Sequence, residues 1–199
     1  DGPVRRHLRS TAAHNTVQLD GAELLEAWSS FRSGRRGRAQ VRARGGDARI
    51  AWLVAAHDGY AWLPGAPRPQ RLWAASADAL WVIDAVTGGG VHRVESRLHL
   101  HPDAPADRFD VVALGDAPLR RESAPLHERF GETRAMARLV CETETLLPWA
   151  GGFVLRFGAR IGAPLPSLAF DGTSARLRAT GVSIAWNVAT ADVSVQSMG

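Results

Sequence analysis

Lysine is absent from the sequence, so all 24 basic residues are arginine. Against 20 acidic residues they give a formal net charge of +4 at pH 7. Guanidinium groups bind carboxylate and sulfate groups in a bidentate manner, which suits an acidic polysaccharide as a partner. Genomic base composition would also produce an arginine-only protein, so the missing lysine does not select a function by itself.

Cysteine is nearly absent as well. Cys141 is alone, which excludes an internal disulfide and leaves the redox compartment open. No stretch approaches 18 uninterrupted apolar residues, so the sequence predicts no membrane span. Residues 1–6 lack the apolar core of a signal peptide and no initiator methionine precedes them, so we expect part of a longer protein.

The densest group of charges lies in residues 32–44, where arginines alternate with glycines. This composition predicts a mobile, solvated loop or a hairpin, with a short exposed strand over residues 38–44. No aromatic residues interleave the run and no groove-reading helix follows it. The sequence therefore does not favour nucleic acid as a partner.

Short apolar or alternating segments separated by Gly, Pro and Asp turns predict an all-β protein. About a dozen strands, with no convincing helix and no repeat of fixed period, are typical of an antiparallel β-sandwich. After a loop over residues 1–13, the predicted strands are 15–19, 38–44, 48–56, 60–63, 71–75, 79–86, 91–101, 109–114, 136–146, 152–157, 167–170, 175–179, 182–188 and 193–196.

Two segments have two possible assignments each. Residues 22–31 have a helical composition, whereas the family resemblance given below favours extended structure there. We expect residues 1–147 to form the main sandwich. Residues 148–199 are expected either to complete it or to form a small C-terminal β subdomain.

Seven histidines offer candidate metal ligands. His99 and His101 share one face of a predicted strand, a spacing that zinc sites use, and His57-Asp58 could add a third group. Such pairs are also common on plain polar strand faces. There is no cysteine cluster, no HExxH helix and no Gly-x-Ser-x-Gly elbow. Glu142 and Glu144 share a strand face, which is more typical of a solvated surface than of a glycosidase.

The seven tryptophans fall into two groups of interest. Trp52, Trp81 and Trp186 lie in apolar runs and are predicted to be core residues. Trp62 and Trp73 flank a proline-rich loop, where an aromatic ring could either pack in the core or stack on a sugar.

The segment from Arg9 to Gly21 reads RSTAAHNTVQLDG and is the most informative stretch of the chain. Residues 16–19 alternate polar with apolar side chains, and Asp20-Gly21 is a strong turn signal. His14 is therefore expected at or just before the start of a strand. A neutral imidazole held there could ligate a metal or move a proton; the alternative is a hydrogen-bonded structural histidine.

This segment resembles the R-S-T-x-x-H-N-T-V-x-V-D-G segment of heparinase II/III-like proteins, a group of bacterial polysaccharide lyases that includes heparin, heparan and alginate lyases. Leu19 stands where valine is common. Looser similarity continues, in the order of the family, over residues 57–63, 81–103 and 126–140. The resemblance covers about three quarters of the chain.

The resemblance implies the C-terminal β-sandwich of a lyase that cleaves uronic-acid-containing polysaccharide by β-elimination. An α-helical toroid would precede the sandwich, and the sandwich would form one wall of the active-site cleft. His14 is implied as a zinc ligand, with Arg9 and Asn15 as substrate-binding residues. The remaining zinc ligands and the catalytic residues would lie upstream of Asp1, so no catalytic residue is assigned here and Tyr60 is expected to be structural.

The resemblance also implies a periplasmic or secreted protein. An interpretation of a different class is a non-catalytic carbohydrate-binding or scaffold sandwich that assists the handling of exopolysaccharide. The two interpretations differ in whether a catalytic toroid accompanies this sandwich.

Overall fold

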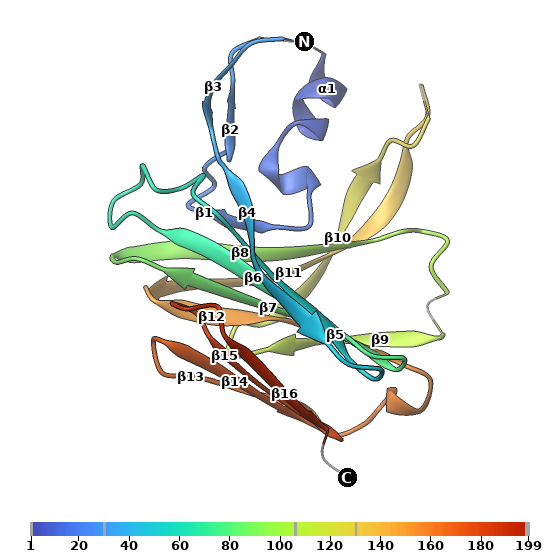
Figure 1. Cartoon of the computed structure of the whole chain (residues 1–199). Helices are drawn as coiled ribbons and strands as arrows, with labels where there is room; N and C mark the ends of the chain where they lie inside the picture. The colour runs from blue at the N-terminus through green and yellow to red at the C-terminus, as the bar shows by residue number, and fades with distance from the viewer. Residues whose placement is uncertain (1, 30, 106, 130, 198–199) are drawn as a thin grey trace.

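The computed structural model describes residues 2–29, 31–105, 107–129 and 131–197 (Figure 1). Strands dominate these residues, so the all-β prediction is confirmed. The strands are β1 (Val17–Leu19), β2 (Leu25–Ala27), β3 (Ser33–Arg36), β4 (Ala39–Gly46), β5 (Ala51–His57), β6 (Arg68–Ala75), β7 (Ala79–Thr87), β8 (Val91–Leu100), β9 (Phe109–Leu114), β10 (Leu119–Leu126), β11 (Arg134–Leu146), β12 (Trp149–Phe157), β13 (Ser167–Phe170), β14 (Ser174–Ala179), β15 (Val182–Asn187) and β16 (Val193–Ser197). The helical elements are α1 (Pro3–Leu8) and two 3-10 turns, η1 (Thr11–Ala13) and η2 (Gly158–Arg160).

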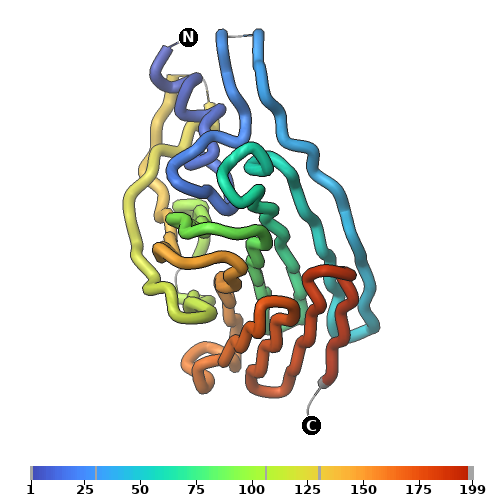
Figure 2. The backbone as a smooth tube through the Cα atoms, turned by 90° about the vertical axis from the view of Figure 1, so that its left-hand side faces the viewer, coloured from blue at the N-terminus to red at the C-terminus, as the bar shows by residue number. Residues whose placement is uncertain are grey.

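Three antiparallel sheets stack on one another in Figure 1. The upper sheet has the strand order β1-β8-β11-β10, the central sheet β4-β5-β6-β7-β12-β9, and the lower sheet β13-β14-β15-β16. A separate hairpin, β2–β3, rises at the same end as α1 (Figure 2). The predicted sandwich is therefore present, with a third layer added by the last four strands.

The middle of the central sheet, at β7, is buried on both faces, which explains the nearly continuous apolar run of this strand. Trp81 and Ile83 face the lower sheet and share a core cluster with Leu177 and Trp186 of that sheet. The residues between them face the upper sheet, because successive side chains of a strand point to opposite faces. A strand covered on both sides needs apolar residues at nearly every position, so the exception in β7, Asp84, requires a partner.

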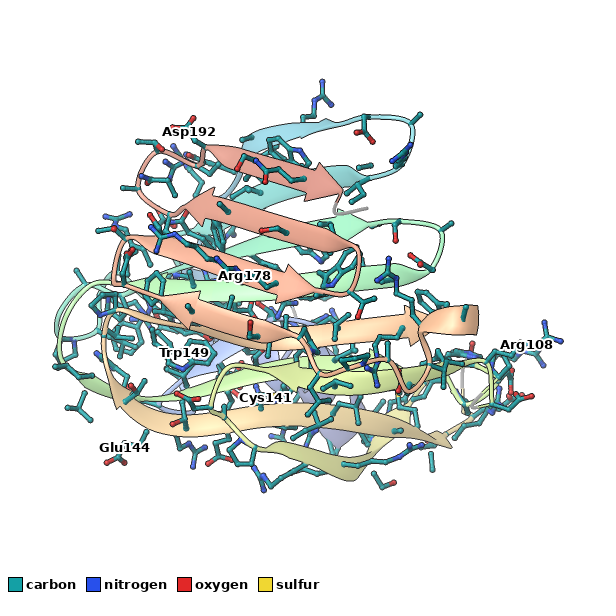
Figure 3. All side chains as sticks on the ribbon, turned by 90° about the horizontal axis from the view of Figure 1, so that it is seen from below. Arg108, Cys141, Glu144, Trp149, Arg178 and Asp192 are labelled. Atoms are coloured by element: carbon teal, nitrogen blue, oxygen red, sulfur yellow. The ribbon has the colours of Figure 1, made fainter. Side chains whose placement is uncertain are left out.

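The lower sheet shows the simpler alternation of a sheet with one solvated face. Leu177 is fully buried, whereas its neighbours Arg176 and Arg178 are exposed. Figure 3, which views the molecule from below, shows Arg178 on this outer sheet. The division at residues 147 and 148 stays a prediction, and β12 lies inside the central sheet between β7 and β9.

Two local expectations are wrong, and one alternative is resolved. Residues 1–13 were expected as a loop, but Pro3, which follows the N-cap Gly2, begins a six-residue helix. Residues 60–63 were expected as a strand, but they form turns closed by bonds such as Ala61 N to Asp58 O, 2.9 Å. The extended alternative for residues 22–31 is confirmed by β2, which pairs with β3.

Within the described residues, no helix has the length and apolar character needed to cross a membrane. Trp81 and Trp186 are fully buried as predicted, and Trp52 packs partly buried against the same core. Trp62 is exposed, and the Arg35 guanidinium lies over its ring, 3.7 Å from the ring centroid. Trp73 is half-buried.

Candidate functional site

His14 and Asn15 lie between η1 and β1, and both are exposed. The backbone N–H of His14 donates to the Thr11 carbonyl (3.1 Å), which ends the 3-10 turn. The chain is extended at His14, with φ −123° and ψ 155°, and β1 begins three residues later. The predicted position of His14, just before a strand, is therefore confirmed, and its ring is directed to solvent rather than packed in the core.

The side chain of Asn15 is held by His99 of β8. Its Oδ1 accepts hydrogen bonds from the His99 backbone N–H (2.7 Å) and from His99 Nδ1 (2.8 Å). An amide oxygen can only accept, so Nδ1 of His99 carries a proton. This pairing fixes Asn15 against the strand that neighbours β1.

The backbone of Asn15 is held from below by a buried arginine. Arg71 Nη1 donates to the Asn15 carbonyl at 2.7 Å. The same guanidinium makes a bidentate pair with Asp84, Nε to Oδ1 at 2.6 Å and Nη2 to Oδ2 at 2.8 Å. Ser96 of β8 bonds both partners. This network links the central sheet to the upper sheet directly beneath the His14-Asn15 segment.

Burial makes this network costly to disturb. Asp84 is 0% exposed and Arg71 only 8% exposed. Isolated buried charges are strongly unfavourable, whereas a bidentate pair with satisfied hydrogen bonds is tolerated. Sequence analysis missed both residues. One signal pointed to them, because Asp84 interrupts the apolar run of a strand predicted to be buried.

Imidazoles and one guanidinium gather around His14. His7, His14, His99 and Arg138 form a group that we call the basic cluster, and burial, followed by the neighbouring basic groups, lowers the pKa of His7 and of His99. For His99, burial is the first cause, followed by Arg138 and Arg97, and together they lower its pKa to about 4. Arg138 is paired with Glu122 at 2.6 Å.

Acidification is expected to destabilise the fold through His99. Its pKa is about 4 in the folded protein and 6.5 in an unperturbed chain, so the unfolded state binds the extra proton between these values. The stability is complete above about pH 6.5 and falls toward pH 4, by on the order of 1–2 kcal/mol after allowance for solvent screening. Urea unfolding at pH 7 and pH 4.5 measures it. A His99→Asn variant with the same pH dependence as the wild type would contradict this assignment.

The other predicted site residues are placed as follows. The Arg9 guanidinium donates to the Ser29 carbonyl at 2.7 Å and so ties α1 to the end of the β2–β3 hairpin. Tyr60 is fully buried, and its hydroxyl lies 3.3 Å from the carbonyl oxygens of Val17 and Ala22. Burial raises the pKa of Tyr60, as expected for a structural tyrosine.

The histidine pair does not converge on one ligand. His99 is bound to Asn15, whereas His101 Nε2 lies 2.8 Å from Glu128 Oε1. Structural zinc sites use four protein ligands and catalytic sites three. Across residues 2–29, 31–105, 107–129 and 131–197, no group of three or more His, Cys, Asp or Glu side chains could hold a metal ion.

These residues therefore do not fit a zinc site by themselves. Zinc at His14 stays a prediction that requires ligands from elsewhere in the protein. No step proposed below depends on a metal.

A cavity of about 150 Å³ adjoins Asn15 on the upper face of the central sheet. Its walls include Trp73, His57 and Ala55, and Arg71 and Asp84 lie at its base. Burial lowers the pKa of His57, which keeps the imidazole neutral at pH 7. The cavity places a half-buried aromatic ring next to the Asn15 segment, so the stacking alternative for Trp73 stays open to test.

Comparison with known proteins decides the family. A model of the family described as heparinase II/III-like, C-terminal, matches residues 1–181. The chain belongs to this family. No curated protein sequence matches the chain. The heparinase II/III-like assignment agrees with the resemblance in RSTAAHNTVQLDG, and it places His14, Asn15 and the basic cluster within the matched residues.

Solved structures share the fold of this heparinase II/III-like domain. A heparan sulfate lyase HepC mutant from Pedobacter heparinus has a TM-score of 0.66 at 14% identity, over 100% of this chain and 33% of that chain. The heparinase III that is the BT4657 gene product has a TM-score of 0.64 at 12% identity, over 100% and 32% of the two chains. The chain thus spans about a third of these structures, so the activity of a whole protein is a matter for proposal.

Proposed function

We propose that this domain forms one wall of the active-site cleft of a polysaccharide lyase that acts on uronic-acid-containing polysaccharide. One observation carries the proposal: His14 and Asn15 are exposed, yet the Asn15 carbonyl is held by Arg71, the Asn15 side chain by His99, and the His14 backbone by Thr11. Loops that carry function are usually positioned by a rigid scaffold in this way. A purely structural histidine would have been packed or hydrogen-bonded within the fold.

The electrostatics support an anionic substrate. β-Elimination removes the proton next to a uronate carboxyl group, and the carboxylate must be neutralised for that proton to leave. Arg138 supplies a permanent positive charge in the group that includes His14, and Asn15 supplies an amide whose oxygen is already engaged by His99. The Asn15 amide nitrogen can therefore donate to a substrate oxygen. Arg9 would contribute through the hairpin that it holds at Ser29.

Catalytic residues are proposed to come from outside these residues, from an α-helical toroid in the same polypeptide. The partner would be an acidic polysaccharide, and the site of action the periplasm or the exterior of the cell. The chain covers about a third of the similar lyase structures, which is consistent with a further domain.

An assay of the full-length polypeptide tests the proposal. Heparan, alginate and related uronates are incubated with it, and the unsaturated product of β-elimination is followed by ultraviolet absorbance. We expect at least one uronate polymer to be cleaved and a neutral glucan to be left intact. Binding of uronate polymers without any unsaturated product would instead support a non-catalytic binding or scaffold sandwich.

A further inference from the structure

A second cationic site lies on the other face of the central sheet. A cavity of about 110 Å³, which we call the arginine pocket, is lined by Arg38, Gln40, Arg42, Asp58, Arg68 and Gln70. Arg71 points from β6 toward the upper sheet. Its neighbour Gln70 points to the opposite face, where it donates to the Val188 carbonyl of the lower layer. Arg68 lies two residues before Gln70 on β6 and therefore shares this face. The arginine pocket shares Ala56, His57 and Gln70 with the cavity beside Asn15, whereas its arginines Arg38, Arg42 and Arg68 do not line that cavity.

Two side chains of the pocket fasten its wall. Arg42 Nη2 donates to the Ala189 carbonyl at 3.0 Å, and Gln70 Nε2 donates to the Val188 carbonyl at 3.1 Å. Gln70 is only 6% exposed. Both carbonyls belong to the β15–β16 loop, which ends near Asp192 and lies beside β4 and β5 in Figure 3.

The loop is closed by hydrogen bonds of its own. Asn187 Oδ1 accepts hydrogen bonds from the backbone N–H groups of Ala189 (3.0 Å) and Thr190 (3.1 Å). Local bonds of this kind replace the missing strand pairing in a turn. Contacts between two sheets therefore hold the Arg42 and Gln70 side chains at the wall of the pocket.

The charges in the arginine pocket are unbalanced. Three guanidiniums face one carboxylate, Asp58, whose Oδ1 already accepts the Arg38 backbone N–H at 2.6 Å. That hydrogen bond is the first cause that lowers the pKa of Asp58, ahead of the charges of Arg68 and Arg38. Among the described residues, no carboxylate oxygen lies within 4 Å of these three guanidiniums. Like charges held together without counterions attract an anion.

We propose that the arginine pocket binds an oxyanion, a sulfate or a carboxylate group carried by an acidic polysaccharide. Guanidinium groups match such oxyanions with two parallel hydrogen bonds each, and a cavity of this size accepts one group. The identity of the polymer rests on the function proposed above. The oxyanion chemistry of the pocket does not, because it follows from Arg38, Arg42 and Arg68 alone.

Titration of the full chain with sodium sulfate tests the pocket, with arginine Nε–H resonances followed at constant ionic strength. Arg38→Gln and Arg68→Gln should each raise the sulfate Kd roughly tenfold, the loss of one charge-assisted contact. Arg178→Gln, which removes the same charge from the exposed lower sheet, should leave the Kd unchanged within about twofold. An equal loss in all three variants, or no saturable binding, would overturn the proposal.

A second titration separates the two possible sources of the oxyanion. A uronate oligosaccharide and its sulfated counterpart replace sodium sulfate, and at least one should bind more tightly than sulfate in an Arg68-dependent manner. Failure of both would limit the pocket to free anions and overturn its role in polysaccharide binding. His14→Ala should leave the sulfate Kd unchanged, so failure of the lyase proposal and failure of this one remain distinguishable.

Discussion

Replacing Asp84 with alanine is expected to lower the free energy of unfolding by about 3–5 kcal/mol. The substitution leaves the Arg71 guanidinium buried, 8% exposed, with no carboxylate to balance it. Breaking a buried ion pair by removing one partner costs far more than the pair contributes as a whole, because the remaining charge is desolvated without compensation. Urea unfolding of the variant and the wild type at pH 7 measures the loss.

Two comparisons sharpen this expectation. Glu144→Ala removes the same type of charge from an exposed position and should change stability by less than about 0.5 kcal/mol. The double variant Arg71→Met/Asp84→Leu removes both charges and should recover most of the stability lost in Asp84→Ala. If Asp84→Ala were no less stable than Glu144→Ala, the pair could not be the element that fixes Asn15.

Replacing His14 with alanine in the full-length polypeptide is expected to lower kcat on a uronate polymer by roughly 10²–10⁴-fold. Effects of this size are typical when a positioned side chain that moves a proton or orients the reacting group is removed. His14 is exposed, so the free energy of unfolding should change by less than about 0.5 kcal/mol. Initial rates of unsaturated product formation measure the effect, and unfolding curves confirm that the variant is folded.

A second histidine variant and a zinc measurement serve as controls for His14→Ala. His101→Ala removes another exposed histidine, which is paired with Glu128 rather than Asn15, and should retain activity within about twofold. A loss below about tenfold for His14→Ala would place the cleft elsewhere. Zinc is measured in both proteins as purified: full metal occupancy in His14→Ala would show that His14 is not a zinc ligand.

Asp84→Ala and His14→Ala test two parts of one chain of contacts. Asp84 holds Arg71, Arg71 holds the Asn15 carbonyl, and the segment then presents His14 to solvent. A milder change in the same chain, Ser96→Ala, removes one hydrogen bond to each member of the pair and leaves both charges in place. The position of the exposed segment thus depends on charges buried beneath it.

Local signals were sufficient for much of this fold. Alternation in residues 16–19 and the Asp20-Gly21 turn placed His14 before a strand, and the RSTAAHNTVQLDG segment indicated the family that the family model matches. The apolar run of residues 79–86 predicted a buried strand, because a strand covered on both faces has little room for polar residues. The helix α1 was not predicted, because its sequence, PVRRHL, is too short for a helical period to be recognised.

The sequence by itself determined the all-β class, most of the strands, the family and the exposed histidine motif, because these depend on residues near one another in the chain. Only the tertiary structure decided that Arg71 meets Asp84 and Asn15, that His99 bonds Asn15 across 84 positions, and that three sheets stack rather than two. The arginine pocket likewise joins β4 to a loop 147 residues away. Periodicity reports which face of a strand is buried, but the partner on the opposite sheet is chosen by packing among distant segments.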